Sequence, residues 1–185
     1  MANKKEDLGW IQTFTGRKFD LIYPEVEDVV IEDIAHALSM KCRYNGHCKE
    51  FYSVAEHSVR VSLMLELEKQ TPEVQFFGLM HDAAEAYLPD VPSPLKHLPE
   101  FGFFRDVERG LETTIAAKFD LPIFKHPVVD WADKQIVFGE MARLMSPLHP
   151  DCFHQGGIPI EGRMLGPERA ENFFLFRYNE LLKLK

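Results

Sequence analysis

Residues 79–96 read LMHDAAEAYLPDVPSPLK, an apolar opening that leads into a group of ionisable side chains and then into prolines. They belong to a segment that starts at Pro72, behind a threonine cap, and is apolar almost all round as far as Tyr87. This pattern predicts one helix in the middle of the domain. His81 and Asp82 would then be buried, and a buried carboxylate has to be neutralised, paired or bound to a metal.

The adjacent His81 and Asp82 form a fork, because neighbouring helical positions point about 100° apart. Two further candidates lie on neighbouring helices: His57, one turn into a helix opened by the Ser53 capping box, and Asp133 in the apolar WADKQ segment. Imidazole nitrogen and carboxylate oxygen together suit Zn, Mn, Fe, Co or Ni better than Ca. The four residues predict a metal site. The alternative is structural: His81 bonds to Asp82 or to a carbonyl, and Asp133 is a cap or an ion-pair partner.

Helical periodicity dominates the rest of the chain. It predicts further helices near 31–41, 53–69, 102–119 and 127–145, and a last one from Pro167. Residues 10–20 alternate loosely around Thr15–Gly16, which suggests a short hairpin. Residues 146–166 are rich in proline and glycine, as is typical of a long surface loop. We therefore expect one all-α domain over residues 1–185, with about six helices and a small N-terminal hairpin.

Composition limits the partners. The 185 residues are 45% hydrophobic and 27% charged, an ordinary balance for a soluble globular domain. The formal net charge of −8 argues against a nucleic-acid polymer, whose binding needs a basic face. No apolar run approaches the roughly 20 residues that span a bilayer, and MANKKEDLGW lacks a secretion core, so we expect no membrane partner and a cytoplasmic location. Cys42, Cys48 and Cys152 have no metal-ligand spacing and predict reduced thiols.

Three motifs carry a resemblance to a known family. SVAEHS around His57, MHDAAEA around His81 and Asp82, and WADKQ around Asp133 resemble the H…HD…D signature of the HD-domain metal-dependent phosphohydrolases. ALSMKCRYNGHCKEFYSVAEHSVRVS, HDAAEAYLPDVPSPLK and RYNELLK are similar to one branch, small bacterial and phage enzymes acting on deoxynucleotides. That branch includes 5′-deoxynucleotidases and the dATP triphosphohydrolases of phages that replace adenine with 2-aminoadenine. The resemblance implies a compact HD-domain helical bundle.

The resemblance also implies which residues bind the metal and which act on water and phosphate. His57, His81, Asp82 and Asp133 would be the ligands of one catalytic divalent metal. Glu85 would hold a water or receive a proton, Asp90 would orient the attacking water, and Arg43 would bind phosphate oxygens through its planar donor fork.

The resemblance further implies residues that contact the substrate. Tyr44 would stack on a base, and Gly46, where relatives carry a bulky aliphatic residue, would leave space beside the base edge. His47 would touch phosphate, or else be a hydrogen-bonded turn histidine. Lys96 would add positive charge, or else be a solvated surface lysine.

The predicted function is hydrolysis of the 5′-phosphate or triphosphate of a (deoxy)nucleotide, with purine deoxynucleotides such as dATP favoured. A triphosphate substrate would bring additional Mg or Mn. The alternatives are a metal- and nucleotide-binding sensor without catalysis and an HD phosphodiesterase for another small phosphoester. Homo-oligomer formation stays open, because the fifteen phenylalanines allow an apolar interface but fill a core as readily.

Overall fold

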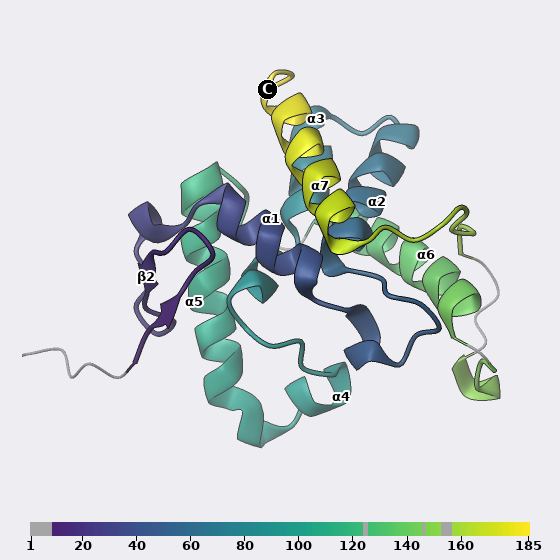
Figure 1. Ribbon diagram of the computed structural model, residues 1–185, viewed down its shortest axis with the longest axis horizontal. Helices are drawn as coiled ribbons and strands as arrows, with labels where there is room; N and C mark the ends of the chain where they lie inside the picture. Colours follow the sequence, from purple (N-terminus) through teal and green to yellow (C-terminus); the bar gives the residue numbers. More distant parts are fainter. Residues whose placement is uncertain (1–8, 124–125, 146, 153–156) are drawn as a thin grey trace, which may run out of the picture.

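The computed structural model describes residues 9–123, 126–145, 147–152 and 157–185. Within them it has seven α-helices and one two-stranded sheet, which confirms the all-α prediction and the N-terminal hairpin (Figure 1). The helices are α1 Ile31–Met40, α2 Val54–Leu67, α3 Pro72–Met80, α4 Ser93–Lys96, α5 Gly102–Phe119, α6 Pro127–Leu144 and α7 Pro167–Leu182. Short 3-10 turns lie between them: η1 Val26–Asp28, η2 Arg43–Gly46, η3 Ala83–Ala86, η4 Pro99–Phe101 and η5 Pro150–Cys152. None of the helices in these residues has the length and apolar character that a bilayer crossing requires.

The hairpin braces the centre of the molecule. Strands β1 (Ile11–Gln12) and β2 (Lys18–Phe19) pair antiparallel, with Ile11 opposite Phe19. The fully buried Phe19 stacks on Tyr87 with ring centroids 4.0 Å apart. Asp33 of α1 accepts hydrogen bonds from the backbone N–H and the hydroxyl of Thr15 in the hairpin turn. Because Tyr87 directly follows η3, this ring contact lets the hairpin support the turn.

Helix α2 packs against α1, α3, α6 and α7 and so forms the middle of the bundle. Its N-terminus is capped as the sequence predicts, since the Ser53 hydroxyl accepts from the Glu56 N–H at 3.1 Å. The Glu56 carboxylate does not complete a capping box, however; it accepts from Arg60 and from the backbone N–H of Leu165. Helix α3 lies directly on α2 at Gly78, where a Cβ would come within 2.3 Å of the Leu65 side chain.

The single helix expected from Pro72 to about Tyr87 is wrong in one respect. Helix α3 ends at Met80, and a separate 3-10 turn, η3, follows Asp82. The His81 Nδ1 lies 2.8 Å from the Gly78 carbonyl oxygen. In a continuing α-helix that carbonyl would accept from the Asp82 N–H, so the imidazole competes for it and the helix ends. His81 and Asp82 therefore lie at a junction rather than inside a helix.

The surface loop expected at 146–166 is also corrected over its described C-terminal part. Ile160 and Met164 are buried and pack with Tyr52 and Leu144. The segment comes this close to α6 because of Gly139, where a Cβ would lie 1.8 Å from the Ile158 carbonyl oxygen. Residues 146 and 153–156 of that prediction lie outside the described part of the chain.

Candidate metal centre

The structure brings the four predicted metal ligands together from three elements. His57 is on α2, His81 and Asp82 are at the junction after α3, and Asp133 is on α6. The His57 Nε2 lies 3.4 Å from the His81 Nε2, 3.8 Å from an Asp82 oxygen and 3.1 Å from an Asp133 oxygen. The His81 Nε2 is 3.2 Å from Asp82 and 4.0 Å from Asp133.

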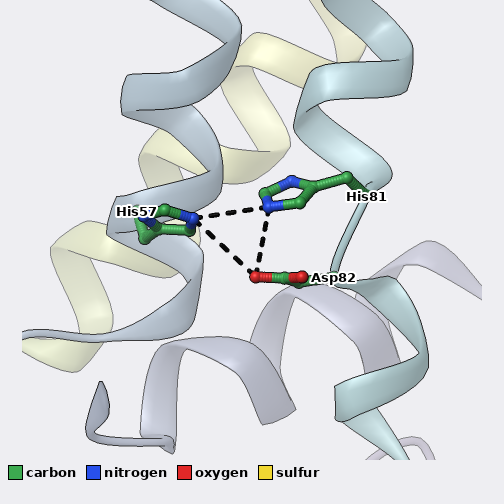
Figure 2. A group of neighbouring side chains, drawn as sticks. All are labelled: His57, His81 and Asp82. Carbon is green, nitrogen blue, oxygen red and sulfur yellow. Dashed lines mark hydrogen bonds and ion pairs between the residues drawn. The ribbon is translucent and has the colours of Figure 1, made fainter. Parts of the chain in front are cut away.

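The tightest group is formed by His57, His81 and Asp82, whose ligand atoms all lie within 4.8 Å of one another. Figure 2 shows both imidazoles and the carboxylate turned toward one common point. Asp133 approaches this group from the α6 side, next to His57, with its side chain 34% exposed. It therefore borders the tight group rather than belonging to it.

The outer nitrogens of the two imidazoles have partners that fix their tautomers. The Nδ1–H of His81 donates to the Gly78 carbonyl at 2.8 Å. The Nδ1–H of His57 donates to the Glu140 carboxylate at 2.6 Å. Each neutral ring then has its lone pair on Nε2, facing the other ring. Metal-binding histidines commonly have this second contact, which orients the ring and raises its basicity.

Glu140 was missed by the sequence reasoning, although it organises the back of the site. Its side chain is fully buried on α6 and accepts from Arg43, Tyr44 and Tyr52 as well as from His57. The signal was present: Glu140 lies seven residues after Asp133, two helical turns along the same apolar face. An acidic residue at such a position needs several donors.

The donor set fits a divalent metal ion. Two ligands on a tetrahedral metal at about 2.0–2.1 Å lie roughly 3.4 Å apart, and the two Nε2 atoms are 3.4 Å apart. Two imidazoles with carboxylate oxygens favour a first-row transition metal or zinc. His57, His81 and Asp82, with Asp133 beside them, could thus hold one such ion.

Electrostatics also favour a cation at this point. Burial would lower the pKa of His81, but the neighbouring Asp82 raises it to about 9. Burial would raise the pKa of Asp82, but His81, His57 and Arg43 hold it well below its usual range. The metal-free cluster therefore draws a proton onto a histidine, and a divalent cation would meet the same attraction.

A cavity of about 880 Å³ opens in front of the cluster, lined by His81, Asp82 and Asp133 among others. Glu85 and Asp90 also line it, and their expected roles toward water and protons stay predictions. Burial, together with the charges of Asp82 and Asp90, raises the pKa of Glu85 to about 7. A carboxyl group with such a pKa can take up and release a proton near neutral pH.

Arg43 and Tyr44 line the same cavity but are already engaged. The Arg43 Nε donates to Glu140 at 3.2 Å, and one terminal nitrogen lies 3.6 Å from Asp82. The Tyr44 hydroxyl donates to Glu140 at 2.6 Å. Both side chains therefore help to hold Glu140, a contact that the sequence did not indicate. Phosphate binding by Arg43 and base stacking by Tyr44 stay predictions.

Of the other predicted substrate contacts, two line the cavity and one does not. His47 and Lys96 line the cavity, and Lys96 is paired with Glu108 at 2.6 Å. Gly46 is exposed, has a φ of +78° and is not among the residues that line the cavity. Cys42 and Cys48, which flank this loop, are free thiols, as expected.

Fold and site together define an all-α protein with a candidate metal centre in the wall of a cavity. No family model matches the chain. The chain is 35% identical over 185 residues to "uncharacterized protein YfdR" of Escherichia coli strain K12, covering 96% of this chain and 98% of that protein. It is 34% identical over 119 residues to "uncharacterized protein RCAP_rcc00048" of Rhodobacter capsulatus, covering 61% and 59%. The protein belongs to the family of YfdR.

Proposed function

We propose that this protein is a metal-dependent phosphohydrolase of the HD class that removes the 5′-phosphate of a (deoxy)nucleotide. One observation carries the proposal. Two imidazoles with fixed tautomers and a carboxylate meet within 4.8 Å at the wall of a cavity that also holds Glu85 and Arg43. A structural His–Asp pair would not need both Nε2 atoms to face each other with their Nδ1 atoms already bonded.

His57, His81, Asp82 and Asp133 would hold the metal. When bound, such a metal lowers the pKa of water and polarises a phosphoryl oxygen. Arg43 lies in the cavity wall between Asp82 and Glu140, so its guanidinium is held in one orientation. From there it can orient a phosphate oxygen through the N–H groups that remain.

Glu85 would move the proton. Its backbone N–H donates to the Asp82 carbonyl at 3.0 Å, which fixes it three residues along the 3-10 turn. Side chains three apart nearly eclipse in a 3-10 turn, so Glu85 projects on the same side as Asp82. With a pKa of about 7, its carboxyl oxygen can accept a proton from attacking water or return one to the leaving oxygen. Asp90, which also lines the cavity, would orient the water.

The charge of the cavity favours a substrate with few phosphates. Seven carboxylates line it against one arginine and one lysine. Arg43 is paired with Glu140, and Lys96 with Glu108. A nucleoside monophosphate therefore matches the cavity better, whereas a triphosphate would need additional Mg or Mn to offset its charge.

The test is phosphate release from deoxynucleoside monophosphates and triphosphates in Mn or Co, with products resolved. Asp82→Asn should lose both metal and turnover, because an anionic ligand becomes a neutral amide. Glu85→Ala should keep the metal and lose about 10²–10⁴-fold in kcat. Asp106→Asn is the control, because Asp106 forms an exposed ion pair with Arg109 on α5. Metal and nucleotide binding without turnover by the unaltered protein would instead identify a sensor.

A further inference from the structure

Part of the cavity lining is apolar and takes no part in the metal centre. This apolar lining comes from α3, from α5 and the segment after it, and from α6; it consists of Phe77, Ile115, Leu121, Ile123 and Val129. We propose that this apolar lining binds the base of the substrate, so that it is the part of the cavity that selects nucleotides over simple sugar phosphates. The inference rests on the proposed function for its phosphate end.

The position follows from helix geometry. Phe77 lies on α3, four residues before His81 at its C-terminal cap, and Val129 lies on α6, four residues before Asp133. Residues four apart share a face of a helix and are separated by about one turn, or roughly 5–6 Å. Both helices thus place an apolar side chain one turn away from a residue of the metal centre. The rest of a phosphate ester held at the centre can therefore reach these side chains.

The wall has the chemistry that a base requires. Phe77 is half-buried and offers an aromatic ring, while Val129 and Ile115 are only 2% and 3% exposed and form a closed floor. Ile123 is 73% exposed and stands at the rim. Planar bases stack on aromatic and aliphatic side chains without regard to sequence. A sugar phosphate without a base would leave this wall in contact with water.

The Tyr44–Gly46 stretch is a poorer base site. Tyr44 is tied to Glu140 through its hydroxyl, and Gly46 does not line the cavity. In addition, the backbone at Gly46 has a φ of +78°, which strains any residue with a side chain. A Cβ added there would meet nothing within 4 Å. The base-edge role expected for Gly46 therefore passes, in this proposal, to the wall around Phe77.

The experiment compares kcat/KM for dAMP with kcat/KM for 2-deoxyribose 5-phosphate in the metal-loaded protein. Phe77→Ala should lower the ratio by roughly 5- to 100-fold, the usual range for loss of one stacking partner. Ile123→Asp tests the rim at an exposed position where folding is not at risk, and it should lower the ratio as well. Phe173→Ala on α7 and Leu67→Asp at the end of α2 are the matched controls, at exposed apolar positions outside the cavity.

Equilibrium dialysis of 2′-deoxyadenosine against the metal-free variants supplies a reading that needs no turnover. Parallel losses of the ratio and of deoxyadenosine affinity in both cavity variants support the proposal. An unchanged ratio in both variants overturns it, as does a loss in the controls of equal size. If the unaltered protein releases no phosphate but binds deoxyadenosine through Phe77, the proposed function fails while the base site stands.

Discussion

At the scale of single residues, Glu140 determines how the candidate centre is built. One buried carboxylate accepts from the His57 imidazole, the Arg43 guanidinium and two tyrosine hydroxyls. Burial would raise its pKa, but His57 and Arg43 hold the pKa of Glu140 far below its usual range. It therefore stays ionised, and through His57 its charge acts on whatever cation occupies the centre.

Glu140→Gln should weaken metal binding by about 10–100-fold, the usual effect of losing a carboxylate behind a metal-binding histidine. The amide keeps the shape but removes the charge and leaves Arg43 without its partner. Metal titration by calorimetry measures the loss. Glu171→Gln is the control, because Glu171 makes the same kind of contact with His36, at 3.0 Å, at a half-buried position between α1 and α7. A variant that melts lower but binds metal normally would reduce Glu140 to a structural role.

At the scale of elements, the close approach of segment 157–160 to α6 supports the same centre. The Ile158 N–H donates to the Gln135 carbonyl of α6 at 3.2 Å. Beyond it, the buried Ile160 and Met164 cover Tyr52, whose hydroxyl donates to Glu140 at 2.8 Å. Gly139 makes this approach possible because it has no side chain. It therefore controls how the segment packs around Tyr52, a partner of Glu140.

Gly139→Ala should destabilise the protein by about 1–3 kcal/mol, the usual effect of overpacking. Its methyl group would overlap the Ile158 carbonyl and push the segment away from α6. Gly110→Ala on α5 is the control. Nothing lies within 4 Å of a Cβ there, so it should be neutral or stabilise the helix by up to about 1 kcal/mol. Urea unfolding compares the two, and equal effects would mean that segment 157–160 yields freely.

At the scale of the whole molecule, a metal at the centre would join α2, the α3–η3 junction and α6. A ligand at 100 times its Kd stabilises the native state by about 2.7 kcal/mol. For a chain of this size that corresponds to a rise in Tm of roughly 5–10 °C. Thermal melts with Co or Mn, against melts in a chelator, measure the difference. Equal Tm values with metal and with chelator would contradict metal binding at this centre.

The same melts should depend on pH. Without metal, the pKa of His81 is raised to about 9, so below that pH a metal must displace a proton before it binds. Each displaced proton weakens the apparent affinity about tenfold for every pH unit of acidification. The metal-induced rise in Tm should therefore be larger at pH 8 than at pH 6. An equal or larger rise at pH 6 would show that His81 is not a ligand.

Most of the helices and the hairpin are predictable from local sequence patterns. Apolar periodicity, the Ser53 cap and the Thr71–Pro72 start located the helices, because these signals act within a few residues of the chain. His81, Asp82 and Asp133 could also be singled out from the sequence. They are ionisable residues in apolar segments, where a buried charge needs a partner. The hairpin was visible for the same local reason.

The way these elements meet depends on contacts between residues that are far apart in the sequence. Glu140 is 83 residues from His57 and 97 from Arg43, so no local pattern could show that it holds both. The break before η3 follows from a side-chain contact, His81 to Gly78, that outweighed the continuous apolar pattern of the segment. The apolar lining of the cavity combines side chains from α3, α5 and α6, which are far apart in the sequence. Packing between distant segments sets these features, and local propensity does not encode it.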